Sequence, residues 1–120
     1  MKRRSKILCC GLLCLDIISY CDEYPEEDSD AKCKEQIWSI GGNATNNCTV
    51  LAQLGSQPYL FASLVKDHSY KFVVESVRNL EINIDHCPIR TEPHQSLPSA
   101  VAIINEKNGT RTIFSRYEIF

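Results

Sequence analysis

The spacing of apolar positions divides the first half of the chain into strand and helix segments. Residues 7–15 form an unbroken apolar run of strand length, typical of a strand buried on both faces. Residues 32–39 alternate in part, which favours an exposed strand. Residues 43–54 carry an apolar stripe at helical spacing, and Gly55 then stands where a left-handed helix stop is expected. Residues 57–65 are typical of a second buried strand, so this half predicts a layered α/β arrangement.

The second half continues the alternation and ends in a hairpin. Asp67 is a good N-cap for a helix whose apolar residues recur at helical spacing. Ile82 and Ile84 alternate with polar neighbours, as in a half-buried strand. Residues 100–107 and 110–115 flank Asn108 and Gly109, a dipeptide that strongly favours a β-hairpin turn. The complete order predicts an α/β fold with a small β appendage.

Three asparagines follow a glycine pair at the start of the first predicted helix. Asn43, Asn46 and Asn47 are spaced to share one face of its first turn. Gly41 and Gly42 let the backbone turn sharply and let a ligand come close. Because side-chain amides both donate and accept hydrogen bonds, the cluster suits a neutral polyol better than a charged ligand. The alternative is a helix that is merely capped by asparagine.

Three motifs occur in an order that resembles the opening of the PfkB (ribokinase-like) carbohydrate kinases. They are a strand-like segment containing Asp16 (residues 11–18), the Gly-Gly-Asn segment (residues 41–46) and the Asn-Gly-Thr-Arg segment (residues 108–113). Within that family, residues 22–29 and the hairpin are most similar to the ketohexokinase (fructokinase) branch. A ribokinase-like or adenosine-kinase-like member of the same family is the nearest alternative.

The resemblance implies an α/β, Rossmann-like ribokinase fold with a small β-sheet lid, or clasp. The lid strands would lie at about residues 17–40 and 99–116, and in fructokinases two lids interlock a homodimer. Such kinases are much longer than 120 residues and carry a Gly-Ala-Gly-Asp-like catalytic motif in their C-terminal half, which does not occur here. We therefore expect residues 1–120 to be the N-terminal part of the kinase domain, with the nucleotide-binding half absent.

The same resemblance assigns sugar-binding roles to individual residues. Asp16 corresponds to a carboxylate that accepts hydrogen bonds from sugar hydroxyls, which are of the strong charge-assisted kind. Gly42, Asn43 and Asn46 match the positions that hold the remaining hydroxyls. Asp28 resembles a clasp carboxylate that reaches the sugar of the partner subunit, although its acidic surroundings also suit a solvated loop.

Arg111 matches an arginine that approaches the transferred phosphoryl group, and an exposed hairpin arginine is the alternative interpretation. A planar guanidinium fits the charge that develops on phosphoryl oxygens. The implied reaction is ATP-dependent phosphorylation of a sugar hydroxyl, with fructose giving fructose 1-phosphate. ATP and Mg²⁺ would be bound mainly by the missing half, so no catalytic residue is expected in this chain. The family also usually has glycine near Ala62 and Glu81.

The charge balance does not indicate a polyanionic partner. A net charge of −2 and a pI near 5.9 give no electrostatic case for nucleic acid or an anionic membrane. Basic residues at positions 2–6 precede the apolar run, as in a signal peptide, but no convincing cleavage site follows. We therefore expect a cytoplasmic protein with no nucleic-acid or membrane partner.

Seven cysteines keep a different class of protein open. A secreted, disulfide-stapled glycoprotein would explain them, and three glycosylation sequons exist at Asn43, Asn47 and Asn108. The odd count leaves one thiol unpaired, and two sequons overlap the amide cluster, so reduced cysteines in the cytosol are the preferred interpretation. The histidines lack metal-ligand spacing among themselves or with the cysteines, and no metal site is expected.

Overall fold

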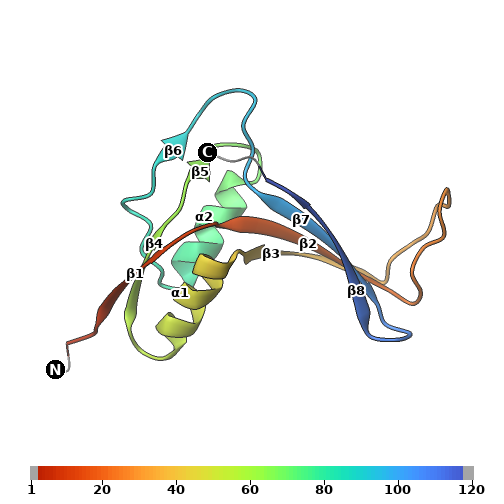
Figure 1. The fold of residues 1–120 in the computed structure, drawn as a ribbon, viewed down its shortest axis with the longest axis horizontal. Helices are drawn as coiled ribbons and strands as arrows, with labels where there is room; N and C mark the ends of the chain where they lie inside the picture. Colours follow the sequence, from red (N-terminus) through yellow and green to blue (C-terminus); the bar gives the residue numbers. More distant parts are fainter. Residues whose placement is uncertain (1–2, 118–120) are drawn as a thin grey trace.

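The computed structural model describes residues 3–117, which form an α/β body and a sheet that projects from it (Figure 1). The body holds both helices and four short strands, and the projecting sheet holds the other four strands. In chain order the elements are β1 (Lys6–Cys10), β2 (Cys14–Cys21), β3 (Glu35–Gly41), α1 (Asn43–Gln53), β4 (Gln57–Phe61), β5 (Leu64–Val65), α2 (Tyr70–Asn79), β6 (Ile89–Arg90), β7 (Ser99–Asn105) and β8 (Thr110–Arg116).

The body is built around parallel pairs of strands covered by the two helices. β1 pairs with β4, and β5 pairs with β6. Helix α1 packs against β1 and β4. Its Cys48 is fully buried, and α2 buries Val73 and Val77 in the same core. The remaining core side chains come mostly from these strands and their connections, among them Leu13, Leu60, Leu64, Val65, Ile82, Ile84 and Leu97.

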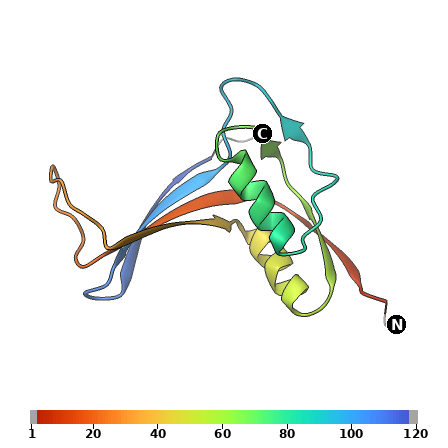
Figure 2. The ribbon, with the colours of Figure 1, turned by 180° about the vertical axis from the view of Figure 1, so that it is seen from behind.

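The projecting sheet has the strand order β3-β2-β7-β8. β2 runs antiparallel to β3 and parallel to β7, and β7 and β8 form a hairpin. Figure 2 shows the sheet extending away from the helices, with the connection between β2 and β3 at its far end. The radius of gyration is 16.4 Å, against about 14 Å expected for a compact domain of this length. The sheet therefore exposes both faces over much of its length.

The prediction of one strand over residues 7–15 is wrong. The run is divided between β1 in the body and β2 in the projecting sheet, with Gly11 to Leu13 as the link. Helix α1 comes so close at Gly11 that a Cβ there would stand 2.8 Å from the Cβ of Ala44. Asp16 consequently lies in the third position of β2, instead of ending a body strand as the sequence suggested.

Three other expectations need correction. Residues 57–65 form two strands, because the chain turns between Phe61 and Leu64. Helix α2 begins at Tyr70 with Ser69 as its N-cap residue, and Asp67 stands two residues before that cap. Residues 82–84 form only an isolated bridge from Tyr59 to Asn83.

Other sequence predictions are confirmed. Helix α1 spans nearly the predicted residues, and Gly55 after it has a φ of 86°. The hairpin turns at Asn108 and Gly109, and β3 lies three residues later than the start expected for it. Of the two positions where the family usually has glycine, Glu81 has a left-handed φ of 60°, whereas Ala62 has no positive φ.

Candidate functional site

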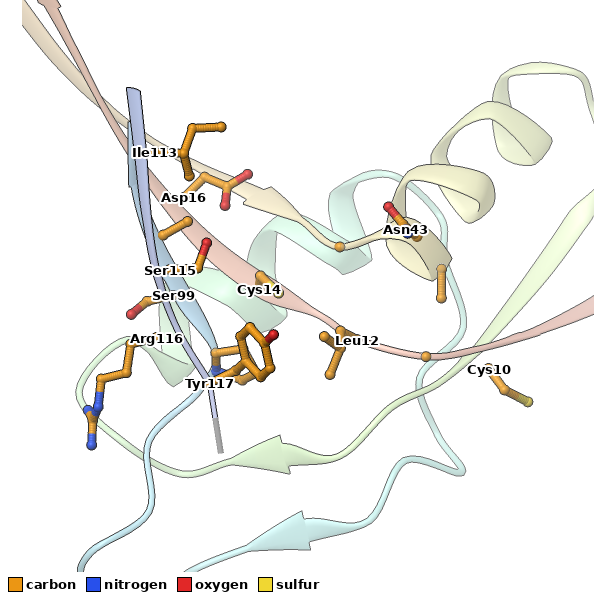
Figure 3. A pocket seen from close by; sticks show the side chains of 15 residues that line it. Cys10, Leu12, Cys14, Asp16, Asn43, Ser99, Ile113, Ser115, Arg116 and Tyr117 are labelled. Carbon is orange, nitrogen blue, oxygen red and sulfur yellow. The ribbon is translucent and has the colours of Figure 1, made fainter. Parts of the chain in front are cut away.

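A cavity of about 650 Å³ opens where the body meets the projecting sheet (Figure 3). The link between β1 and β2 and the first turn of α1 form one side of it, and β2, β7 and β8 form the other. Its lining combines a carboxylate, an amide, hydroxyls and thiols with apolar side chains. The lining residues are Cys10, Gly11, Leu12, Cys14, Asp16, Gly42, Asn43, Ala44, Pro98, Ser99, Ala100, Ile113, Ser115, Arg116 and Tyr117.

The glycine pair gives the cavity its shape by leaving out two side chains. Gly42 is the N-cap residue of α1, with φ 98° and ψ 142°, a backbone conformation that is almost confined to glycine. A Cβ on Gly42 would also collide with the carbonyl oxygen of Leu12, and one on Gly41 with the carboxylate of Asp16. The two glycines therefore let the helix start come up against β2.

A buried threonine fixes the first turn of α1 beside the cavity. The hydroxyl of Thr45 donates a hydrogen bond of 3.0 Å to the carbonyl of Leu12 in the link between the strands. The N–H of Asn46 donates to the carbonyl of Gly42 at 2.9 Å, which closes the first helical turn. The backbone N–H groups that precede it have no acceptor within the helix. Asn43 is thereby held at the rim with its amide toward the opening (Figure 3).

Asp16 supplies the negative charge in the cavity lining. In Figure 3 its carboxylate and the amide of Asn43 border the same space from opposite sides. Partial burial raises the pKa of the Asp16 carboxyl. Within residues 3–117 no donor within hydrogen-bonding distance of this carboxylate is found, so its acceptor sites are available to a ligand. Burial, reinforced by the negative charge of Asp16, also raises the pKa of the neighbouring Cys14 thiol, which lies two residues away on the same face of β2.

The structure brings three of the expected sugar-binding residues together. Asp16, Gly42 and Asn43 all line the cavity. Asn46 is exposed one turn further along α1 and does not line it. Asp28 lies outside it, in the connection between β2 and β3, with a left-handed φ of 59°.

Arg111 lies on the same face of the sheet as Asp16 but farther from the body. In the register of the strands, Asp16 is level with Ala100 and Ser115, whereas Arg111 is level with Ile104 and Tyr20. Four residues along a strand correspond to about 13 Å. Arg111 is exposed and does not line the cavity, so it faces the space beyond the cavity mouth.

Sequence reasoning missed the wall that β7 and β8 contribute. Ile113 and Ser115 face the cavity because they share with Arg111 the alternate positions of β8. The hairpin register could have indicated this face, but not its position against the body. Arg116 lies at the cavity edge, where it donates a hydrogen bond of 2.8 Å to the hydroxyl of Ser96.

Two kinds of feature are absent from the described residues. Across residues 3–117, no three His, Cys, Asp or Glu side chains come together as a possible metal site. Neither helix in that range has the length and apolar character that crossing a bilayer requires. All seven cysteines lie in that range as well, and all are free thiols.

Comparisons with known proteins place this geometry in a family. The profile described as "pfkB family carbohydrate kinase" matches residues 4–118. Ketohexokinase of Mus musculus is 41% identical over 108 residues, which are 90% of this chain and 36% of the mouse protein. The chain thus spans little more than a third of the length of that relative.

Solved structures agree on the fold. The nucleoside kinase of Methanocaldococcus jannaschii, described as an archaeal member of the ribokinase family, superposes with a TM-score of 0.74 at 22% identity, over 97% of this chain and 38% of that one. Arabidopsis thaliana ribokinase, solved with ribose and ATP, gives a TM-score of 0.75 at 19% identity, over 96% of this chain and 36% of its own. The fold of the chain is therefore the ribokinase fold.

Proposed function

Because the chain belongs to the pfkB family of carbohydrate kinases, we propose that it provides the sugar-binding part of an ATP-dependent kinase of the ketohexokinase type. The substrate would be fructose and the product fructose 1-phosphate. The observation that carries the proposal is the Asp16 carboxylate, which faces the same cavity as Gly42 and Asn43 and has no partner among the described residues. The identity with mouse ketohexokinase favours a ketohexose as substrate.

The chemistry of the cavity suits a polyol. Asp16 accepts hydrogen bonds from two adjacent hydroxyls, and these bonds are strengthened by its charge. Asn43 both donates to and accepts from a third hydroxyl. Gly42 leaves room for the ligand to lie against the backbone. Asn46, one turn further along α1, contacts the sugar at the mouth of the cavity.

The phosphoryl group would approach from the side of Arg111. A guanidinium on the cavity face of β8 fits a group that carries negative charge on several oxygens. Mg²⁺ bound with ATP would neutralise phosphate charge, and its ligands and the proton-accepting carboxylate would come from the part of the family's length that this chain does not span. We therefore expect these 120 residues to bind sugar without transferring phosphate.

A second copy of the protein would cover the rest of the projecting sheet. The cavity face continues outward through Ile37, 36% exposed, and Ile113, 48% exposed. Such an apolar face favours pairing with an identical face in a homodimer. Asp28, which is remote from the cavity of its own chain, would then reach the sugar of the partner subunit. A cytoplasmic location fits the seven free thiols.

Two alternatives predict different ligands. A ribokinase-like or adenosine-kinase-like protein would prefer ribose or adenosine, and the ribokinase and nucleoside kinase among the structural relatives keep this open. A secreted, disulfide-stapled glycoprotein would bind none of these ligands, and it would show six blocked cysteines when thiols are counted in denaturant without reductant.

The decisive experiment is calorimetric titration of the 120-residue chain with fructose, ribose and adenosine, first alone and then for Asp16→Asn. We expect fructose to bind most tightly and the variant to lose at least about tenfold in affinity, because a charge-assisted acceptor is lost. Asp30→Asn, an exposed change in the β2–β3 connection, is the control and should bind as the parent does. Unchanged binding by Asp16→Asn would overturn the proposal, and preference for ribose would move it to the alternative branch.

A further inference from the structure

The arms of the connection between β2 and β3 bring two cysteines opposite each other. The ladder between the strands ends with Tyr20 paired to Glu35. One residue beyond it, the N–H of Lys34 donates a hydrogen bond of 2.7 Å to the carbonyl of the same Tyr20. Two consecutive residues of one arm therefore face a single residue of the other, which is the pattern of a β-bulge. The next residues toward the tip of the connection are Cys21 on one arm and Cys33 on the other.

A second observation places both thiols on one side of the sheet. A hollow of about 350 Å³ lies at this end of the molecule, and both Cys21 and Cys33 line it. Ser19, Gln36 and Val101 line it as well, and these residues belong to the sheet face opposite the sugar cavity. Residues facing each other across antiparallel arms have Cα atoms about 4.5–5.5 Å apart. This separation lies within the range that a disulfide spans.

Ion pairs hold the base of the connection in this arrangement. The ammonium of Lys34 lies 2.7 Å from Glu106 and 3.4 Å from Asp22. Lys107 pairs with Glu23 at 2.6 Å. These exposed ion pairs link both arms to the β7–β8 hairpin at residues next to the two cysteines in the sequence.

Three of the other cysteines, Cys14, Cys48 and Cys87, are less suited to exchange. Burial raises the pKa of the Cys48 thiol to about 12, with further contributions from Cys9 and Cys87. Burial also raises the pKa of Cys14 and of Cys87. A thiol that stays protonated is a poor nucleophile. Cys33, in contrast, is exposed, and Cys21 is half-buried beside it.

We propose that Cys21 and Cys33 are a redox couple that closes the β2–β3 connection with a disulfide when a low-molecular-weight disulfide such as oxidised glutathione is present. The thiolate of Cys33 attacks a sulfur of glutathione disulfide, and one glutathione leaves as its thiolate. The thiolate of Cys21 then attacks Cys33 in the mixed disulfide and displaces the second glutathione. Two protein thiols are oxidised, their two protons are released to solvent or to the leaving thiolates, and one glutathione disulfide is reduced to two glutathiones.

The couple would act on the segment that carries Asp28. A bond between Cys21 and Cys33 closes residues 22–32 into a loop and restricts where Asp28 can reach. This consequence rests on the proposed function, in which Asp28 contacts the sugar of a partner subunit. The formation of the disulfide does not depend on the proposed function, and mapping it requires neither sugar nor dimer.

The test is disulfide mapping of the folded 120-residue chain in a glutathione redox buffer. After an acid quench and alkylation of remaining thiols, cleavage before aspartates and after lysines isolates Cys21 in residues 16–21 and Cys33 in residues 33–34. We expect these two peptides to be linked, at a yield about tenfold above that from the chain unfolded in urea, where no structure raises their effective concentration. Recovery of both peptides alkylated and separate would overturn the proposal.

Single substitutions provide the matched controls. Cys33→Ser should leave Cys21 as a free thiol or as a mixed disulfide with glutathione, not linked to another peptide of the chain. Cys10→Ser, a change at another exposed cysteine, should leave the linked peptide unchanged. Loss of the linked peptide in the Cys10→Ser variant would show that the Cys21–Cys33 link depends on Cys10, which would contradict direct closure of the β2–β3 connection. Because the mapping on the unmodified chain stands alone, the proposal stays testable even if one variant folds poorly.

Discussion

The body and the projecting sheet are stabilised in different ways. Nearly every buried apolar side chain belongs to the body or its connections. Among the described residues, Leu15 is the one buried apolar side chain that comes from the four strands of the sheet. In the sheet, Trp38 is 43% exposed and Phe114 is 58% exposed. The body therefore depends on the hydrophobic effect, whereas the sheet depends more on its backbone ladder and its attachment. The candidate site lies at the junction and needs both.

Several contacts join the two regions, in addition to the chain itself and to the packing of Leu15, Ile17 and Ile40 against the core. The ring of Trp38 in β3 meets Phe72 of α2 edge to face at 5.5 Å. Thr45 holds the start of α1 to the carbonyl of Leu12. The carboxylate of Asp67 accepts a 2.9 Å hydrogen bond from the N–H of Leu97, in the loop that leads into β7. The packing of Trp38 and these two hydrogen bonds thus position the sheet wall of the cavity against the body wall.

Truncation of one side chain in each region gives the sharpest test of this contrast. Leu60→Ala in β4 should lower the free energy of unfolding by about 3 kcal/mol, because Leu60 is 1% exposed and a cavity would remain. Ile113→Ala in β8 should cost less than about 1 kcal/mol, because that side chain is half exposed. Urea unfolding of both variants measures the difference. Equal losses would show that the sheet is as tightly packed as the body.

The second prediction concerns the glycine at the junction. Gly42→Ala should lower the free energy of unfolding by about 2 kcal/mol or more, because the backbone conformation excludes a side chain and the Leu12 carbonyl occupies its place. It should also abolish sugar binding. Gly55→Ala is the matched control, since Gly55 has a positive φ but open space around it, and should cost only about 1 kcal/mol. Thermal unfolding measures the loss of stability in each variant, and calorimetric titration measures its sugar binding. Similar losses of stability in Gly42→Ala and Gly55→Ala would contradict the steric argument.

The sequence predicted the elements whose residues interact locally. Helix α1, its stop at Gly55 and the hairpin at Asn108 and Gly109 follow from spacing and turn chemistry within a few residues. The core face of α2 follows in the same way, since Val73 and Val77 recur at helical spacing and are fully buried.

The remaining features depend on contacts between distant segments. Residues 7–15 alone do not show that helix α1 packs closely against Gly11, or that the apolar run forms two strands in different sheets. The two-residue strands β5 and β6 exist only because they meet each other. For the site, a sequence motif predicts Asp16, Gly42 and Asn43, and these three residues line one cavity. Ser115 and Arg116 line it as well, but only because β2 and β7 bring β8 beside it, which the sequence does not show.

The third prediction weakens one of the contacts at the junction. Asp67 accepts hydrogen bonds from the N–H and hydroxyl of Ser69 and from the N–H of Leu97. Burial alone would raise the pKa of its carboxyl, but these hydrogen bonds outweigh that effect and lower it. Asp67→Asn should therefore cost about 1–2 kcal/mol at neutral pH.

The dependence of this loss on pH has a definite sign. Because the pKa of Asp67 is lower in the folded chain than in the unfolded chain, its contribution is complete above the ordinary value of 3.8 and is lost as the pH falls through the folded pKa. Urea titrations from neutral pH down through that window should show the parent and Asp67→Asn converging. Asp85→Asn, an exposed change, should follow the parent throughout, and a constant gap between parent and Asp67→Asn would contradict the assignment.

The smallest predicted effect is a gain, at a turn of the body that is far from the sheet. Glu81 follows α2 with a φ of 60°, and a side chain in this left-handed region costs about 1–2 kcal/mol. Glycine there loses about 0.5–1 kcal/mol through its greater freedom in the unfolded chain. Glu81→Gly should therefore raise the free energy of unfolding by about 0.5 kcal/mol. Leu80→Gly, next to it with a φ of −86°, should lower the same free energy, because no backbone strain is relieved there, while the entropic cost and the loss of a partly buried side chain both apply. Since neither residue lines the cavity, sugar affinity should stay constant in both variants. A change in affinity with Glu81→Gly would show that backbone strain at this turn affects the geometry of the cavity.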